Sequence, residues 1–131
     1  SRRLADTLVS AREIKTTKDL ANLVERVVGG RKGKIHPATR VFQALRMAVN
    51  DELGALREGL DQAKDLIEGN GRIVVISFHS LEDRIVKNTY KEWQLEGLGE
   101  ILTKKPVVPR DGEIQENPRS RSAKMRVFKI L

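Results

Sequence analysis

The sequence predicts an α/β fold: the second half of a doubly wound, Rossmann-like sheet, preceded by helices. Apolar residues recur at helical spacing through the first half of the chain. An unbroken β-branched run, Ile73-Val74-Val75-Ile76, then lies between turn residues, as is typical of a strand buried on both faces of a parallel sheet. A short loop and a helical pattern follow that run at once, which is the order of elements in α/β sheets.

Size and charge narrow the class of protein. The chain has 131 residues, 39% of them hydrophobic, so it can form one modest domain or one piece of a larger one. Its 25 Lys and Arg against 18 Asp and Glu give a formal charge of +7, which favours an anionic partner, with nucleic acid first. Many small basic proteins bind nothing specific, so charge alone leaves that partner open.

Several classes of site and location are disfavoured. The chain has no cysteine and only two histidines, which argues against disulfides and against a structural metal site. No apolar run approaches the roughly 20 residues that span a bilayer, and the first residues lack the apolar core of a signal peptide. We expect a soluble, cytoplasmic protein with no bound metal and no membrane partner.

The first third of the chain predicts two helices. Apolar residues fall on one face of a segment at about residues 3–14. Thr16 supplies an N-cap hydroxyl with Asp19 three residues on, so a second helix should begin there. It should end at Gly29-Gly30, because glycine adopts the left-handed conformation of a helix C-cap.

A third helical pattern follows a basic loop at residues 31–34. Pro37 suits a helix N-terminus, and apolar residues recur from there to Glu68. The pattern predicts one long helix or two collinear ones, with Gly54 and Gly59 as weak points.

The second half combines strands with a further helix. After the strand at residues 73–76, Ser80 is expected to cap a helix that begins at Leu81 and continues to about Trp93, with Ser80 and Asp83 as a capping-box pair. Beyond it we expect, in order, a strand, an extended segment, a helical turn, a loop and a last strand, at residues 100–103, 104–109, 111–116, 116–124 and 125–131.

Three strands are too few for such a sheet. A buried parallel strand needs a neighbour on each side, and with only two other strands readable, unpaired backbone groups would remain on an apolar edge. We therefore expect part of the sheet to lie outside this sequence. The isolated chain should associate with the missing N-terminal segment or with itself.

The strongest candidate site follows the buried strand. Ligands of open α/β sheets bind beyond the carboxyl ends of the strands, and here polar residues and a helix N-terminus occupy that position. The alternative is that they only cap the helix, with Arg84 paired to an acid on the surface. A nucleophilic triad is disfavoured, because no Gly-x-Ser-x-Gly turn is present. The candidate residues are Ser77, His79, Ser80, Glu82 and Asp83.

Two basic segments could contact nucleic acid. Arg40, Gln43 and Arg46 share one helix face, preceded by Lys34 and His36, and arginine can form paired hydrogen bonds with phosphate. A solvated helix face is the equally simple alternative. Ahead of the last strand, a loop carries a second set with the same two interpretations: Asn117, Arg119 and Arg121.

Three blocks of the chain, in the right order, resemble the ribosomal RNA small subunit methyltransferase H family, also called MraW. They are His-Pro-Ala-Thr-Arg-Val-Phe-Gln-Ala-Leu-Arg at residues 36–46, the segment around Ser-Phe-His-Ser-Leu-Glu-Asp-Arg at 77–84, and Glu-Asn-Pro-Arg-Ser-Arg-Ser at 116–122. The resemblance covers essentially the whole chain.

The resemblance implies an enzyme that transfers a methyl group from S-adenosylmethionine to N4 of a cytidine in 16S ribosomal RNA of the small ribosomal subunit. It implies a class I methyltransferase sheet, with residues 1–34 as the end of an inserted helical substrate-recognition domain and residues 35–131 as the C-terminal part of the methyltransferase domain. The glycine-rich cofactor loop of the family has no counterpart here, so no cofactor residue is assigned and the isolated chain is expected to be inactive.

The implied reaction suggests hypothetical roles for several of the candidate residues. Ser77, His79 and Ser80 would line the pocket for the target base, with Glu82 or Asp83 orienting them, while the arginines hold the RNA backbone. The competing interpretation is a module derived from such an enzyme that binds RNA or protein without catalysis.

Overall fold

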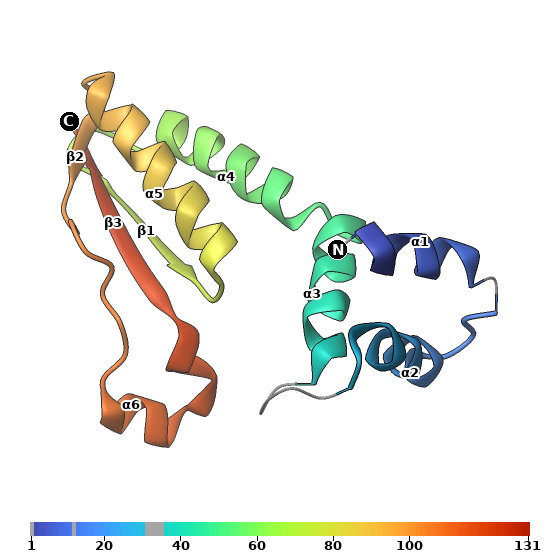
Figure 1. Cartoon of the computed structure of the whole chain (residues 1–131). Helices are drawn as coiled ribbons and strands as arrows, with labels where there is room; N and C mark the ends of the chain where they lie inside the picture. Colours follow the sequence, from blue (N-terminus) through green and yellow to red (C-terminus); the bar gives the residue numbers. More distant parts are fainter. Residues whose placement is uncertain (1, 12, 31–35) are drawn as a thin grey trace. The chain divides into compact units, whose positions relative to one another are not determined.

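The computed structural model describes residues 2–11, 13–30 and 36–131 (Figure 1). The chain divides into two compact units, one ending at Asp51 and the other running from Glu52–Leu131. No helix within the described ranges is both long enough and apolar enough to cross a membrane.

The first unit consists of helices. Thr16 caps the second of them as predicted: its Oγ1 accepts a hydrogen bond from the amide of Asp19, whose carboxylate accepts one from the amide of Thr16. Gly29 ends that helix in the left-handed conformation, with φ 84°. The first helix is shorter than predicted and ends at Ser10. The helices are α1 (Arg2–Ser10), α2 (Thr17–Val28) and α3 (Pro37–Val49).

The long apolar pattern forms two helices, α3 and α4 (Glu52–Leu66). The break falls at Asn50-Asp51, where Asp51 has a φ of 46°, a left-handed conformation that Asp tolerates better than most residues. Both Gly54 and Gly59 lie inside α4, so the weak points predicted at these glycines are wrong. Packing of α4 into the core of the second unit outweighs the helix propensity lost at two glycines.

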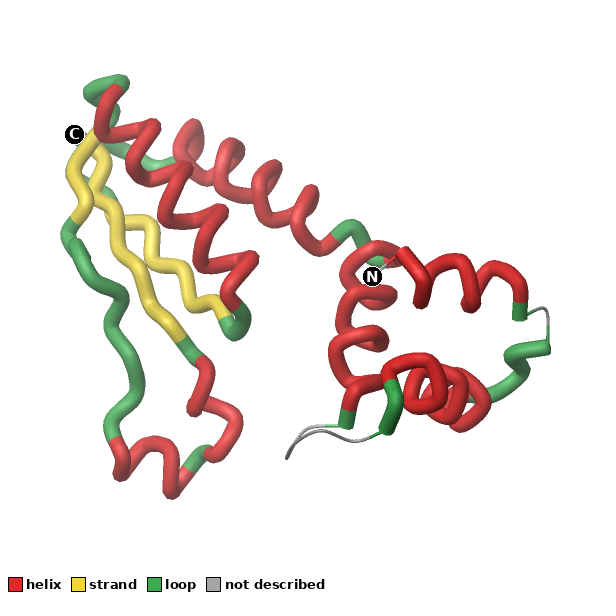
Figure 2. Tube along the Cα trace, viewed as in Figure 1, coloured by secondary structure: helices red, strands yellow, loops and turns green. Residues whose placement is uncertain are grey.

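The second unit is a small sheet with helices on one face (Figure 2). Its strands are β1 (Arg72–Ser77), β2 (Gly99–Ile101) and β3 (Lys124–Ile130). The strand order is β1-β3-β2, and both pairs are antiparallel. Helix α5 (Ser80–Leu95) packs on β1 and β3, and α4 packs against α5.

The strand β1 differs from its prediction in two ways. It pairs antiparallel with β3, and among the described residues it forms the edge of the sheet rather than a parallel centre. Only its helix-facing side is buried, since Ile73 is 6% exposed while Val74 and Ile76 are 54% and 56% exposed. A β-branched run is compatible with a central parallel strand and with an antiparallel edge strand, because it indicates a strand without indicating the direction of the neighbouring strand.

The core of this unit lies between the sheet and its helices. The rings of Tyr90, Trp93 and Phe128 pack together with centroids 5.2–5.6 Å apart. The hydroxyl of Tyr90 donates a hydrogen bond to the carbonyl of Ile73, 3.2 Å away, and burial raises the pKa of this phenol. Leu60 of α4 and Val86 of α5 complete the buried cluster.

The segment between β2 and β3 is more regular than predicted. The predicted helical turn is confirmed as α6 (Asp111–Glu116). The following residues, predicted as a loop, form the 3₁₀ helix η1 (Pro118–Ser122), because Asn117 caps it through its side-chain oxygen and Pro118 suits its first position. Val107 of the extended segment pairs with Met125.

Candidate functional site

The predicted site lies where β1 ends and α5 begins, but a different residue caps the helix. His79, not Ser80, is the N-cap: its Nδ1 accepts a hydrogen bond from the amide of Glu82 at 3.4 Å. The Glu82 carboxylate in turn accepts from the amides of Phe78 and His79, at 3.0 Å and 3.3 Å. Ser80 becomes the first helical residue, and its side chain is exposed.

Asp83 does not form the capping box that the sequence predicted for it. Its carboxylate accepts two hydrogen bonds from the guanidinium of Arg126 on β3, at 2.7 Å and 3.3 Å, and lies 3.5 Å from Nζ of Lys124. The hydrogen bond from Arg126 is the main reason that the pKa of Asp83 is lowered, against the opposing effect of burial. This buried pair ties the start of α5 to the centre of the sheet.

Ser77 also contributes to this connection. Its side chain is 4% exposed and its Oγ donates to the carbonyl of Lys124 at 3.4 Å. Within the second unit, Ser77 thus holds the end of β1 against β3, and Asp83 holds the start of α5 there, whereas Ser80 is exposed. A role of these residues in catalysis stays a prediction.

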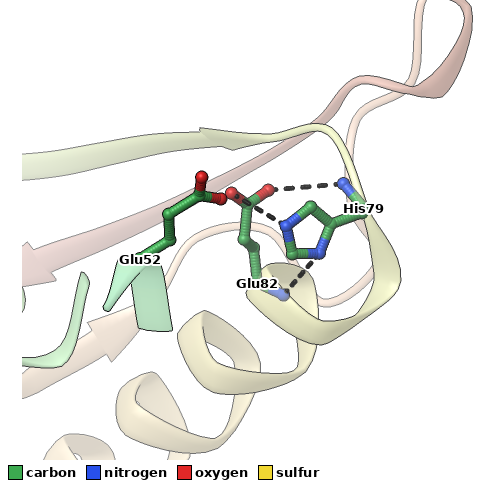
Figure 3. Close-up of side chains that lie close together, drawn as sticks. All are labelled: Glu52, His79 and Glu82. Atoms are coloured by element: carbon green, nitrogen blue, oxygen red, sulfur yellow. Dashed lines mark hydrogen bonds and ion pairs between the residues drawn. The ribbon is translucent and has the colours of Figure 1, made fainter. Parts of the chain in front are cut away.

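A third acidic side chain, from Glu52 at the start of α4, lies beside His79 and Glu82 (Figure 3). One nitrogen or oxygen from each of the three lies within 4.8 Å of the others. Because Nδ1 of His79 accepts the helix-capping hydrogen bond, the neutral ring carries its proton on Nε2. That nitrogen is buried and 3.2 Å from a Glu82 oxygen, but it lacks the geometry of a hydrogen bond within the described chain.

This arrangement decides what the three groups can bind. An imidazole and two carboxylates are ligand types that suit divalent transition metals. A metal on Nε2 would require the ring proton to move to Nδ1, which would then face the Glu82 amide and break the helix cap. The geometry therefore favours an Nε2–H group beside the Glu82 carboxylate, with Glu52 close to both, over a metal centre.

The predicted RNA-contacting residues are divided between the two units. In the first, His36 is the N-cap of α3 through Nδ1, and its Nε2 lies 3.7 Å from the carboxylate of Glu25. On α3, Arg40 and Arg46 are exposed and Gln43 is half-buried. Lys34 falls outside the described residues.

In the second unit, Arg119 and Arg121 lie on η1 with exposed side chains. Asn117 has a structural role there, since its Oδ1 accepts the amide hydrogen of Arg119. The structure thus gives His36 and Asn117 capping roles and leaves the two η1 arginines accessible to an anion.

Comparison with known proteins identifies the family. The model of the MraW methylase family matches residues 1–131. The chain belongs to this family.

Curated relatives of this MraW-family chain carry the name ribosomal RNA small subunit methyltransferase H. The protein from Coprothermobacter proteolyticus is 56% identical over 98% of this chain and 44% of its own length. Those from Persephonella marina and Rhodopirellula baltica are 54% and 55% identical and are covered over 46% and 40% of their lengths. The chain therefore spans less than half the length of these relatives.

Two residues of the site in this MraW-family chain were missed from the sequence. Arg126 lies on the core-facing side of β3 with Phe128, and a buried charge at such a position needs a partner. The alternation of residues along this strand could therefore have indicated Arg126 from the sequence. Glu52 gave no such signal, because its position beside His79 depends on how α4 packs against α5.

Proposed function

We propose that this chain is the C-terminal part of a cytoplasmic enzyme that methylates N4 of a cytidine in 16S ribosomal RNA, using S-adenosylmethionine. The observation that carries the proposal is the polar cluster after β1, in a chain of the MraW methylase family. There a helix N-terminus, an imidazole and two carboxylates gather, and the exposed Ser80 is the first residue of that helix.

The chemistry of N4 methylation needs such groups. The lone pair of the exocyclic amine is delocalised into the ring, so the amine must be oriented and must lose a proton as it is methylated. Ser80 and the carboxylate edges of Glu52 and Glu82 offer hydrogen-bond acceptors for an amine. His79 orients Glu82 through the capping box, while Ser77 and Asp83 fix this end of the sheet.

No cofactor residue is assigned among the described residues of this chain. No glycine-rich loop follows a strand in the described ranges, since β1 runs directly into Ser77-Phe78-His79. We therefore assign cofactor binding to the part of the longer protein outside this chain. S-adenosylmethionine would supply the methyl group.

Two substitutions at one position test the role of His79 in the longer enzyme. Asparagine is a good N-cap but lacks an imidazole, whereas alanine removes the cap as well. We expect His79→Asn and His79→Ala each to lower methyl transfer to small-subunit RNA by roughly 100-fold, as for loss of an acid–base or orienting group. Calorimetry should show unchanged affinity for S-adenosylmethionine.

If His79→Asn transferred methyl groups at the wild-type rate, the imidazole would have no part in the reaction, and His79 would act only as a helix cap. A normal rate in Asn with a low rate in Ala would assign the whole effect to capping. Circular dichroism of both variants checks that α5 still forms.

The RNA backbone is proposed to contact the exposed arginines of α3 and η1. Arg40 and Arg46 lie on the first of these helices, and Arg119 and Arg121 lie on the second. Guanidinium groups bind phosphate through paired hydrogen bonds, and such contacts position RNA without reading its sequence.

We also propose that the remaining part of the longer protein covers the open face of the sheet. Val74 and Ile76 project from that face and are each more than half exposed. Their cross-strand partners are Val127 and Met125, so the exposed apolar surface is continuous across two strands. The free edge of β1 offers unpaired backbone groups beside it. Either association with that segment or self-association of the isolated chain would bury this surface.

A further inference from the structure

The second unit contains a cavity that is lined in part by Arg126, the partner of Asp83. It has a volume of about 210 Å³ and is bounded by α5, by the residues that follow β2, and by β3. Its lining residues with an aromatic or aliphatic side chain are Tyr90 and Ile101. The remaining lining residues are Lys87, Lys91, Gln94, Thr103, Lys104 and Arg126.

The charge of this cavity is one-sided. Four of its lining residues are cationic, and none is acidic. Lys87 and Lys91 are one turn apart on α5, and Lys104 lies across the cavity on the segment after β2. All three lysines are exposed, and none is ion-paired within the described part of the chain. The field inside the cavity therefore favours an anion.

The oxygen atoms of the two neutral polar side chains already accept hydrogen bonds. Gln94 accepts a hydrogen bond from the amide of Ile101 at 3.0 Å, and Thr103 accepts one from the amide of Val127 at 2.9 Å. Arg126 uses Nε and Nη2 on Asp83, which leaves the N–H groups of Nη1 outside these two hydrogen bonds. Recognition in this cavity thus draws on the three lysines, on one edge of Arg126 and on the amide N–H groups of Gln94.

We propose that this cavity binds a phosphodiester of the RNA strand, with the adjoining ribose against Ile101. The volume is below the roughly 300 Å³ at which sites for drug-sized ligands begin, so one phosphate and its sugar fit better than a whole cofactor. The choice of RNA as the anion rests on the proposed function and on the formal charge of +7. Lys87, Lys91 and Lys104 then bind the RNA in addition to the arginines of α3 and η1.

The test compares two triple variants of the full chain that remove the same charge. Lys87→Gln, Lys91→Gln and Lys104→Gln together remove the cavity lysines. Lys15→Gln, Lys18→Gln and Lys105→Gln remove three exposed lysines that do not line it. Binding of a fluorescein-labelled single-stranded 12-nucleotide RNA is followed by anisotropy at several salt concentrations.

We expect the cavity variant to bind this RNA about tenfold or more weakly than the parent. The slope of log affinity against log salt should become shallower by about 0.7 for each phosphate that the variant no longer neutralises. The control variant should retain most of the parent's affinity. Equal losses of affinity in the two variants would mean that net charge alone causes the effect, and this would overturn the proposal. A parent chain that does not bind the RNA would also overturn it.

Methyl transfer by the longer protein separates this proposal from the proposed function. The cavity variant should raise KM for small-subunit RNA while kcat at saturating RNA stays near wild type. If the longer protein transfers no methyl group to RNA but the cavity variant still loses RNA affinity, the proposed activity fails and RNA binding by the cavity stands.

Discussion

Asp83 and Arg126 form the most consequential pair of side chains in the second unit. Their side chains are 12% and 9% exposed, so neither charge can regain water if the other is removed. The guanidinium spans from β3 to the first turn of α5 through two hydrogen bonds. Breaking such a pair by removing one partner costs more than the pair contributes, because an uncompensated charge stays buried.

Replacing Asp83 by Asn should destabilise the second unit strongly. We expect a loss of about 3 kcal/mol in the free energy of unfolding, measured by urea denaturation followed by Trp93 fluorescence. The matched control is Glu100→Gln, which breaks the more exposed pair with Lys129 and should cost less than about 1 kcal/mol. Similar losses in the two variants would contradict the importance given to the buried pair.

The same pair predicts a pH dependence. Folding lowers the pKa of Asp83, so the ionised carboxylate stabilises the folded state at pH values above its unfolded pKa, about 3.9. That contribution is lost as the pH falls through the lower pKa of the folded state. The difference in unfolding free energy between the parent and Asp83→Asn should therefore be constant near neutrality and shrink below about pH 4. A difference independent of pH would argue against an ionised Asp83.

The two helix caps show how far single residues could be predicted. Thr16 and Asp19 were assigned from their spacing, and the structure confirms both hydrogen bonds. At α5 the same rule selected Ser80, but His79 and Glu82 form the capping box one residue earlier. Ser80 does not cap the helix, and Asp83, its predicted capping-box partner, instead binds Arg126, which lies 43 positions further along the chain. The spacing of residues within a short segment cannot show an interaction with a residue so far away in the sequence.

Among the elements, β2 comes very close to the backbone of its neighbour β3, and the close contact lies at Gly99. A Cβ atom on Gly99 would collide with the carbonyl oxygen of Lys129 and lie 2.6 Å from Cε1 of Phe128. Phe128 is fully buried, so its ring has little room to move. Glycine is therefore required at this position, where β2 pairs with β3.

Gly99→Ala should weaken this strand pairing and lower the melting temperature, with a cost of roughly 1–3 kcal/mol as for overpacked cores. Gly112→Ala is its control. A Cβ there meets nothing within 4 Å, and in α6 alanine should be neutral or stabilising by about 0.5–1 kcal/mol. Differential scanning calorimetry measures both. A neutral effect at Gly99 would mean that β2 can shift away from β3.

Element type was more predictable than element arrangement. The strands near residues 73–76 and 125–131 are confirmed, because each has its own pattern of apolar residues, and the helical turn at 111–116 is confirmed as well. The antiparallel pairing of β1 with β3 is set by contacts between distant segments. Two helices were one of the predicted alternatives for residues 37–68, but the position of the break was not predicted, since apolar spacing continues through Asn50-Asp51.

At the scale of the molecule, the open face of the sheet governs association. Val74→Lys with Ile76→Lys would place two charges on that face. We expect sedimentation velocity to show concentration-dependent association of the parent chain and a monomer for this variant. The control, Leu66→Lys with Leu95→Lys, changes two apolar residues that are more than 80% exposed outside the sheet and should still associate. A parent that stays monomeric would contradict self-association through this face.

The aromatic cluster makes the two units separable by spectroscopy. The only tryptophan and the only tyrosine of the chain, Trp93 and Tyr90, are both buried in the core of the second unit. Intrinsic emission therefore reports on the sheet unit alone, while far-ultraviolet ellipticity also records the helices of the first. Denaturation curves from the two signals will coincide only if both units melt in one cooperative step, so the sequence carries its own reporter of inter-unit cooperativity.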